Sequence, residues 1–322
     1  MQLRISLFGL PTAQWIQTAA PINPAINAPS AQRVKLTRAV ESLLMYLLVQ
    51  RRSTHTRESL IGVFWGEQAD EQARGCLSTA LWRLRRALEP DPTLHGQILL
   101  TTPQGAVGIL RSDRVWLDVE AFEDVAQPLL AKPAQTLTPA TAQQLKHAVS
   151  MYSGPLLEGF YEDWALRERE RLHAMYINSL ACLMRYCHQQ ADHAEAIVYA
   201  QSILEQDSLR EDVHRTLMRL FHENGQRTQA MQQYEQCRQL LHHELGIEPM
   251  PETQALCRNI SQNTLPVTRP QHDGTKNSQK DFDERTCVAG PEKSVYHQLK
   301  CALSDLDSLR QRLQGALDFL DS

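Results

Sequence analysis

Arginine and small hydroxyl side chains alternate with apolar residues between positions 70 and 89. One set of apolar residues recurs at helical spacing and must form a buried face: Ala73, Leu77, Ala80, Leu81, Leu84 and Leu88. The other positions carry the residues that could do chemistry, which are Arg74, Gly75, Cys76, Ser78, Thr79, Trp82, Arg83, Arg85 and Arg86. Arginine can bond bidentately to guanine or bind phosphates, and Ser and Thr can do either more weakly. The pattern therefore predicts a helix that can lie in the major groove of double-stranded DNA.

A second interpretation of the same helix is purely structural. Many surface helices have a solvated face on which arginine stems cover the edge of the core. Composition alone slightly favours this interpretation. The position of the helix, third in its segment and directly before a hairpin, favours DNA binding instead.

The elements around this helix predict a mixed N-terminal domain over residues 1–117. Residues 3–8 alternate apolar and polar, as in a strand, and an irregular loop is expected over 18–31. Helices are predicted over residues 36–50 and from Thr56, which is a candidate N-cap. Residues 98–102 and 106–110, separated by a turn that contains Gly105, predict a hairpin. A strand, three helices and a terminal hairpin are the order of a winged helix-turn-helix.

Residues 118–261 are predicted to form an all-α domain. No proline occurs between Pro155 and Pro249, so long helices can run there. Several positions recur 34 residues apart, as in Ala196 and Ala230, or Leu183 and Leu217. A 34-residue helix-turn-helix period is that of tetratricopeptide (TPR) repeats. The fold class expected for the chain is therefore mainly α, a winged helix followed by TPR-like helical repeats.

The C-terminal part of the chain has a different composition. Residues 262–294 are polar and predict a disordered linker. Residues 295–321 predict an amphipathic helix, because leucines follow heptad spacing from Leu299 to Leu320. Two roles remain open for this helix, which are self-association and docking on the chain's own repeats.

Charge and cysteine content narrow the function class. Residues 1–117 hold 13 Lys and Arg against 8 Asp and Glu, whereas the rest holds 20 against 29, for a net charge of −4. The seven scattered cysteines include no Cys-x-x-Cys pair, which predicts a reduced, cytoplasmic protein. The longest apolar run is seven residues, too short for a membrane span. No membrane association is expected.

No catalytic or metal-binding constellation is predicted. The sequence has no P-loop, no Gly-x-Ser-x-Gly and no His-Glu-x-x-His motif. His242 and His243 are adjacent and cannot face one metal from a helix, and His188 and His193 flank a turn where surface positions are expected. The sequence thus predicts no enzyme, no cofactor and no metal.

Four stretches resemble a known family, the stand-alone regulators of the SARP type. They are residues 77–88 in the third helix, 115–123 at the domain junction, 152–164 leading into 168–172, and 244–253 before the last helix. The family joins an OmpR/PhoB-type winged helix to a bacterial transcriptional activator domain (BTAD) built from TPR-like helices. The resemblance spans about residues 30–260.

The resemblance implies a sequence-specific DNA-binding transcription regulator, and an activator is expected. Its partners would be promoter DNA, with RNA polymerase and a second copy of the chain as candidates for contacts with the BTAD. It places Arg83 at a base-reading position and Arg85 at a phosphate contact, with Thr79, Trp82 and Arg86 on the same side as Arg83. Arg74, Ser78 and Gly105 complete the expected DNA-binding set.

Departures from the family pattern imply an altered sequence preference. Ser78 stands where many relatives have Arg, and Cys76 where many have Asn. The predicted wing reads Gly105-Ala-Val-Gly108 rather than Gly-Tyr, so an aromatic wing contact is not expected.

The alternative function is a protein-interaction module, in which the TPR-like helices bind a protein and the winged helix is vestigial.

Overall fold

The computed structural model describes residues 2–16, 32–131 and 137–262. The irregular loop predicted over 18–31 lies outside these ranges. The linker predicted beyond residue 262 and the amphipathic helix predicted over 295–321 also lie outside the described residues.

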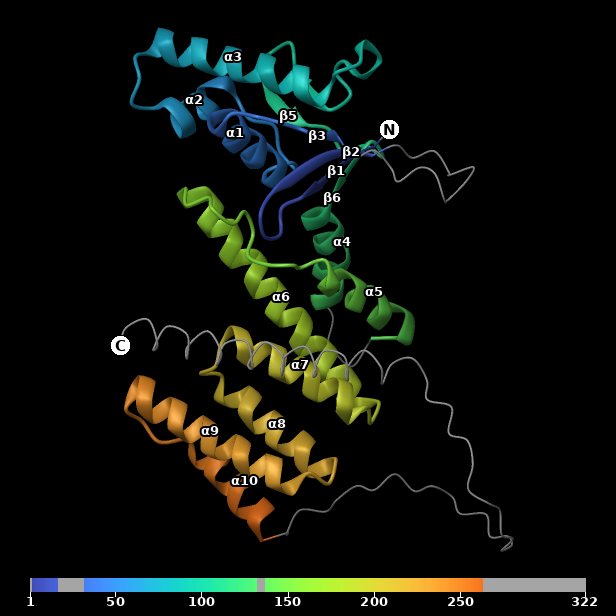
Figure 1. Ribbon diagram of the computed structural model, residues 1–322, viewed down its shortest axis with the longest axis vertical. Helices are drawn as coiled ribbons and strands as arrows, with labels where there is room; N and C mark the ends of the chain where they lie inside the picture. Colours follow the sequence, from blue (N-terminus) through green and yellow to red (C-terminus); the bar gives the residue numbers. More distant parts are fainter. Residues whose placement is uncertain (1, 17–31, 132–136, 263–322) are drawn as a thin grey trace, which may run out of the picture. The chain divides into compact units, whose positions relative to one another are not determined.

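A four-stranded sheet opens the chain (Figure 1). It contains β1 (Gln2–Ser6), β2 (Thr12–Ile16), β3 (Gln32–Arg33) and β6 (Val115–Leu117), in the order β3-β2-β1-β6. β1 pairs antiparallel with β2 and parallel with β6, so the last strand of the N-terminal segment returns beside the first. Of the four strands of this sheet, the sequence predicted only β1. β2, which is as long as β1, also alternates, with Ala13 and Trp15 buried, and it is not among the predicted elements.

Three helices and a hairpin follow, as predicted, and form the winged helix-turn-helix. The helices are α1 (Arg38–Val49), α2 (Arg57–Trp65) and α3 (Asp70–Leu88), and a short 3-10 turn (Pro92–Leu94) leads into the hairpin of β4 (Leu99–Thr101) and β5 (Val107–Ile109). Thr56 is the N-cap of α2, because its hydroxyl accepts a hydrogen bond from the backbone N–H of Ser59 at 3.1 Å.

The rest of the described chain is helical. Its elements are α4 (Asp118–Leu130), α5 (Pro139–Ser150), α6 (Asp163–Gln189), α7 (His193–Gln206), α8 (Glu211–Glu223), α9 (Arg227–Leu245) and α10 (Pro251–Ser261). α6 packs on α7 and α8 packs on α9, as in successive TPR-like helix pairs. In the described ranges, no helix combines the length and apolar character that crossing a bilayer requires.

The 34-residue period of the sequence corresponds to two turns of the same geometry. Ala191 and Gly225 both take a left-handed conformation, with φ of 59° and 75°. In the first turn the backbone N–H of residue 192 donates to the carbonyl of Cys187 at 2.9 Å, and in the second the N–H of residue 226 donates to that of Phe221 at 2.7 Å. Ala196 and Ala230, one period apart, are both fully buried at the helix crossings.

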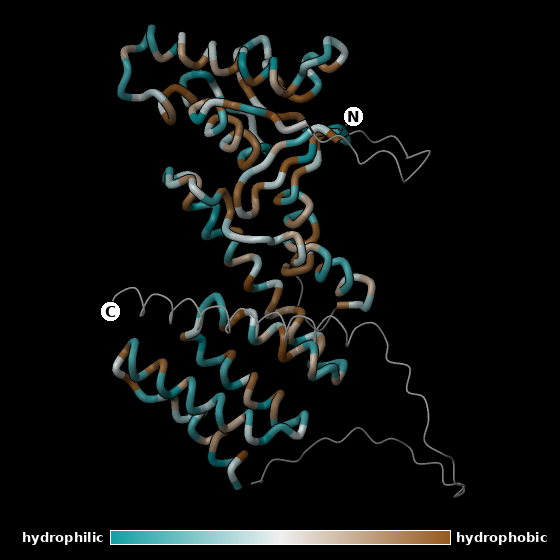
Figure 2. The backbone as a smooth tube through the Cα atoms, in the orientation of Figure 1, coloured by the Kyte–Doolittle hydropathy of each residue, from teal (hydrophilic) through white to brown (hydrophobic). Residues whose placement is uncertain are grey.

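Hydrophobic packing does not stop at the junction expected at residue 117. One core cluster continues from the sheet and α1–α3 into α4, α5 and α6 as far as Leu183, and a second joins α6 to α10. Figure 2 shows hydrophobic residues alternating with hydrophilic ones along these helices. The winged helix therefore shares its core with the first helices of the activator domain.

Candidate nucleic-acid interface

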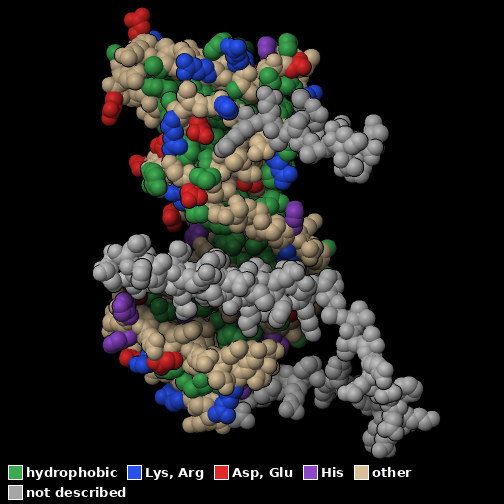
Figure 3. Space-filling view, in the orientation of Figure 1, with side chains coloured by type: hydrophobic (Ala, Val, Ile, Leu, Met, Phe, Trp, Pro, Cys, Tyr) green, Lys and Arg blue, Asp and Glu red, His purple; other side chains and the backbone are tan. Residues whose placement is uncertain are grey.

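The third helix has the two faces that the sequence predicts. All six apolar residues named for the buried face are at most 7% exposed. Arg74, Ser78, Thr79, Arg83 and Arg86 are exposed, Arg85 is half-buried, and Trp82 is 59% exposed. Figure 3 shows Lys and Arg side chains over this helix at the top of the view.

The exposed residues occupy different edges of α3. At about 100° per residue, Thr79, Trp82 and Arg86 lie near the middle of the exposed arc. Arg83 lies at one edge, and Arg74, Ser78 and Arg85 lie at the other, next to the hairpin. Within the described chain, Arg74 and Arg83 make no hydrogen bond or ion pair, so their guanidinium groups are available to a ligand.

Trp82 and Arg86 form a pair at the centre of this arc. The Arg86 guanidinium lies 5.5 Å from the centre of the Trp82 ring, within cation–π range. A shallow depression of about 320 Å³ beside them is lined by Arg83 and by Lys35 and Thr37 from the segment before α1. A large aromatic ring and three cations therefore line one continuous surface.

The β4–β5 hairpin is fixed against the helix-turn-helix. His55 and Val107 exchange two backbone hydrogen bonds of 2.8 Å, which attach β5 to the segment before α2. Gly108 lies so close to this segment that a Cβ there would come within 3.3 Å of the Thr54 methyl group. Gly105 turns the hairpin with φ +84°, a conformation that other residues adopt only with strain. The hairpin is thus held in the position of a wing.

Arg85 connects α3 to this wing. Its guanidinium donates to the Thr101 hydroxyl at 3.0 Å and to the carbonyl oxygen of Leu99 at 3.4 Å, and its Nε lies 3.6 Å from the Glu89 carboxylate. Glu89 is buried and accepts backbone hydrogen bonds from the strand entry at Ile98 and Leu99. The side chain expected at a phosphate contact is therefore held at the base of the wing.

Arg57, the first residue of α2, was not singled out from the sequence. Its Nη1 donates to the Ser78 hydroxyl at 3.3 Å, and its stem lies 3.7 Å from the position that a Cβ on Gly105 would occupy. Arg57 thus lies between α3 and the tip of the wing. The sequence shows an arginine at this position. Only the packing of the hairpin against the helix-turn-helix shows that Arg57 belongs to the site.

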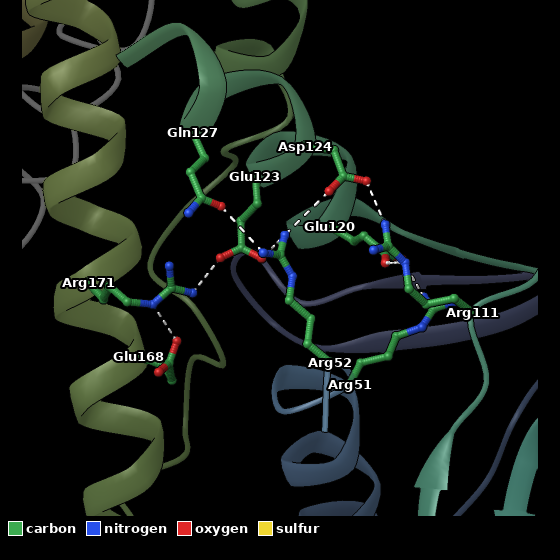
Figure 4. A network of polar contacts seen from close by, with 9 residues as sticks. All are labelled: Arg51, Arg52, Arg111, Glu120, Glu123, Asp124, Gln127, Glu168 and Arg171. Carbon is green, nitrogen blue, oxygen red and sulfur yellow. Dashed lines mark hydrogen bonds and ion pairs between the residues drawn. The ribbon is translucent and has the colours of Figure 1, made fainter. Parts of the chain in front are cut away.

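A network of charges joins the winged helix to the activator domain (Figure 4). Arg51 pairs with Glu120 at 2.6 Å, Arg111 bridges Glu120 and Asp124, and Arg171 from α6 pairs with Glu123. Burial lowers the pKa of Arg51, although the neighbouring Glu120 opposes this shift. Glu120 and Glu123 belong to the stretch 115–123, so this stretch makes the junction between the two parts.

A backbone connection reinforces the junction. Gly9 donates to the carbonyl of Pro155, and Leu157 donates to that of Leu7, so the segment after α5 lies beside the end of β1. The guanidinium of Arg169 donates to three carbonyls of this segment, those of Leu156, Leu157 and Phe160, at 2.7–2.8 Å. The stretch 152–164 thus builds a loop that α6 holds in place.

Comparisons with known proteins agree with this architecture. Residues 117–261 match the family profile described as bacterial transcriptional activator domain. Regulatory protein AfsR of Streptomyces coelicolor is 29% identical over 222 residues, which are 69% of this chain but 22% of AfsR. Transcriptional regulatory protein MoaR1 of Mycobacterium tuberculosis is 24% identical over 68% of this chain and 70% of its own length.

A solved structure extends the likeness to the fold. EmbR of Mycobacterium tuberculosis, in complex with a low-affinity phosphopeptide, superposes with a TM-score of 0.63 at 17% identity, over 81% of this chain and 65% of EmbR. The chain spans less than a quarter of the AfsR proteins that it matches. The chain thus carries a bacterial transcriptional activator domain joined to a winged helix, and it is similar to the regulatory proteins AfsR and MoaR1.

Proposed function

We propose that this chain binds promoter DNA in a sequence-specific manner, with α3 in the major groove and the β4–β5 hairpin beside the phosphate backbone. The observation that carries the proposal is the exposed arc of α3, where Arg74 and Arg83 have no partner among the described residues. A 19-residue helix is about 28 Å long, enough to lie along the groove.

The polar side chains of α3 and its surroundings are expected to contact different parts of the DNA. Arg83 is free at one edge of α3 and is the base-reading residue, since a guanidinium can bond both acceptors of guanine. Thr79, Trp82 and Arg86 lie next to it and add contacts to bases or sugar-phosphates. Arg74 and Arg57 lie toward the wing, where phosphates would pass. Arg85 serves mainly as a positioning residue that orients the wing through Thr101.

The activator domain would supply the protein contacts. The descriptions of AfsR and MoaR1 as regulatory proteins support transcriptional control as the outcome, and the description of the matched domain supports activation as its sign. RNA polymerase and a second copy of the chain are the proposed partners of α4–α10. The shared core would let DNA binding and these contacts act as one rigid unit.

The test is selection of random duplex DNA on the full chain at roughly 150 mM salt, repeated with Arg83→Ala. We expect an enriched motif, such as two half-sites about 10–10.5 bp apart, and a loss of about 1–3 kcal/mol with relaxed base preference in the variant. Arg258→Ala, which removes an exposed arginine of α10, is the matched control and should leave the motif unchanged. Binding no tighter than the nonspecific range of about 10⁻⁴–10⁻⁶ M would contradict the proposal and favour the interaction module.

Arg85→Ala separates the two roles that this residue could have. A direct phosphate contact predicts that the slope of log K against log salt falls by about 0.9. A wing-positioning role predicts weaker binding to all sequences with that slope unchanged, and faster hydrogen exchange at Leu99 and Thr101. We expect the second result, because the guanidinium is already bonded to β4.

A further inference from the structure

Three side chains from three different helices meet at the turn between α6 and α7. His188 lies in the last turn of α6, His193 is the first residue of α7, and Glu223 is the last residue of α8. The left-handed conformation of Ala191 makes the turn tight enough for both imidazoles to lie on one side of it. Their ligand atoms and a carboxylate oxygen of Glu223 all lie within 4.8 Å of one another.

The distances are close to those of a tetrahedral metal centre. Zinc–nitrogen and zinc–oxygen bonds of about 2.0–2.1 Å place neighbouring ligand atoms about 3.3 Å apart. His188 Nε2 is 2.7 Å and His193 Nδ1 is 3.6 Å from the same oxygen of Glu223. Side-chain adjustments of this size need no backbone movement, since all three residues are partly exposed at helix ends.

His193 lacks the partner that its burial requires. Its Nδ1 is inaccessible to solvent and has no hydrogen bond, because 3.6 Å to Glu223 is too long for one. Glu223 has no Lys or Arg partner in the described ranges. A divalent cation between the three groups would resolve both deficits.

Neighbouring donors are already occupied, which limits the ligand set to these three. The Asp192 carboxylate caps α7 by accepting from the backbone N–H of Glu195 at 3.1 Å. The buried Cys187 thiol donates to the Glu195 carboxylate at 3.4 Å, so it already has a partner. The ligands are therefore two imidazoles and one carboxylate, without a thiolate.

We propose that His188, His193 and Glu223 form a binding site for a divalent transition metal such as Zn²⁺, with the fourth position open to water. Two imidazoles favour zinc over calcium or magnesium, which prefer oxygen ligands. The bound metal links the α6–α7 pair to α8 of the next pair and thereby braces the helical repeat. This function is independent of DNA binding by α3.

The test is titration of the chelator-treated full chain with zinc chloride, with binding measured by isothermal calorimetry. We expect one equivalent to bind, and His193→Asn and Glu223→Gln each to weaken binding at least ten-fold. The matched control is the double variant His242→Gln and His243→Gln, which removes an exposed histidine pair of α9 and should bind zinc as the parent does. Zinc should also raise the melting temperature of the parent and of the control, but not of Glu223→Gln.

Cobalt substitution identifies the ligands directly. Co²⁺ in the proposed site should show the absorption of a tetrahedral nitrogen and oxygen environment, without a thiolate charge-transfer band. A thiolate band, or unchanged zinc affinity in Glu223→Gln, would overturn the proposal by placing the metal elsewhere. Absence of any zinc binding to the parent would overturn it as well. Circular dichroism of the metal-free variants checks that they fold like the parent.

Discussion

The Asp118 carboxylate accepts a hydrogen bond from the backbone N–H of Leu7, with both oxygens 2.9 Å away, across 111 residues of sequence. It also accepts from the N–H of Phe8 at 3.1 Å and from its own helix at Val119. Burial raises the pKa of Asp118, and these donors oppose that shift by stabilising the charged form. One side chain therefore ends β1, begins α4 and joins the winged helix to the activator domain.

Asp118→Asn should destabilise the protein by about 1–3 kcal/mol, because an amide leaves buried N–H groups without a charged acceptor. Chemical denaturation measures the change. Asp113→Asn is the control, since Asp113 is exposed and its side chain makes no described contact. Equal effects of the two substitutions would show that the connection to β1 contributes nothing to stability.

Neighbouring arginines in the junction should differ strongly. Arg51 is 4% exposed and pairs with Glu120, whereas Arg52 is 52% exposed in its pairs with Glu123 and Asp124. Arg51→Met should cost toward the lower end of about 3–5 kcal/mol, since Arg111 still pairs with Glu120. Arg52→Met should cost less than about 1 kcal/mol. Urea denaturation of both variants provides the comparison, and a larger loss for Arg52→Met would contradict the assignment.

Exchanging alanine and glycine at the two equivalent turns of the repeat should change the stability of the protein in opposite directions. Ala191→Gly should stabilise the protein by about 1 kcal/mol, because it relieves a left-handed residue that has a Cβ. Gly225→Ala should destabilise it by about 1–2 kcal/mol through backbone strain alone, as no atom lies within 4 Å of the added Cβ. Thermal denaturation measures both. Changes of the same sign would argue against equivalent turns.

Gly75 lies on the exposed arc of α3, and a Cβ there would meet no atom within 4 Å. Gly75→Ala should therefore raise the free energy of unfolding by about 0.5–1 kcal/mol through helix propensity. If this arc enters the major groove, the added methyl group should weaken DNA binding at the same time. Higher stability with unchanged affinity for the selected motif would show that the arc does not face the DNA closely.

Acidification should weaken the helical repeats through His214. Burial lowers the pKa of His214 below its usual 6.5, and the ring accepts from Gln233 at 2.6 Å while it bonds to the carbonyl of Ser208 at 2.9 Å. The unfolded chain takes up the proton first, so stability that is present above pH 6.5 falls as the pH decreases below it.

Comparison of the parent with His214→Gln between roughly pH 7.5 and 5 isolates this contribution. The variant should be less stable at the upper end, and the difference should shrink toward the lower end. A difference that stays constant with pH would exclude His214 as the titrating group. His243→Gln, at an exposed position of α9, is the control and should follow the parent.

Local patterns in the sequence determined much of this protein. The spacing of apolar residues predicted α1–α3 and both faces of α3, because a helix buries every third or fourth residue whatever its partner. Two short apolar runs separated by a turn predicted the hairpin. The 34-residue period likewise predicted repeated helix-turn-helix units, and the structure has equivalent turns at Ala191 and Gly225 with matching hydrogen bonds. The family motifs then indicated which parts belong together.

Only the tertiary structure decided which distant groups meet. β2 pairs with β1, and the two-residue β3 pairs with β2, so both strands depend on partners that their own residues do not reveal. The wing holds Arg85 through a hydrogen bond, and Arg57 lies between the wing and α3. In the helical repeats, the packing of α8 places Glu223 beside His188 and His193. Sequence spacing carries no information on such contacts, because they depend on how helices and strands far apart in the chain pack against one another.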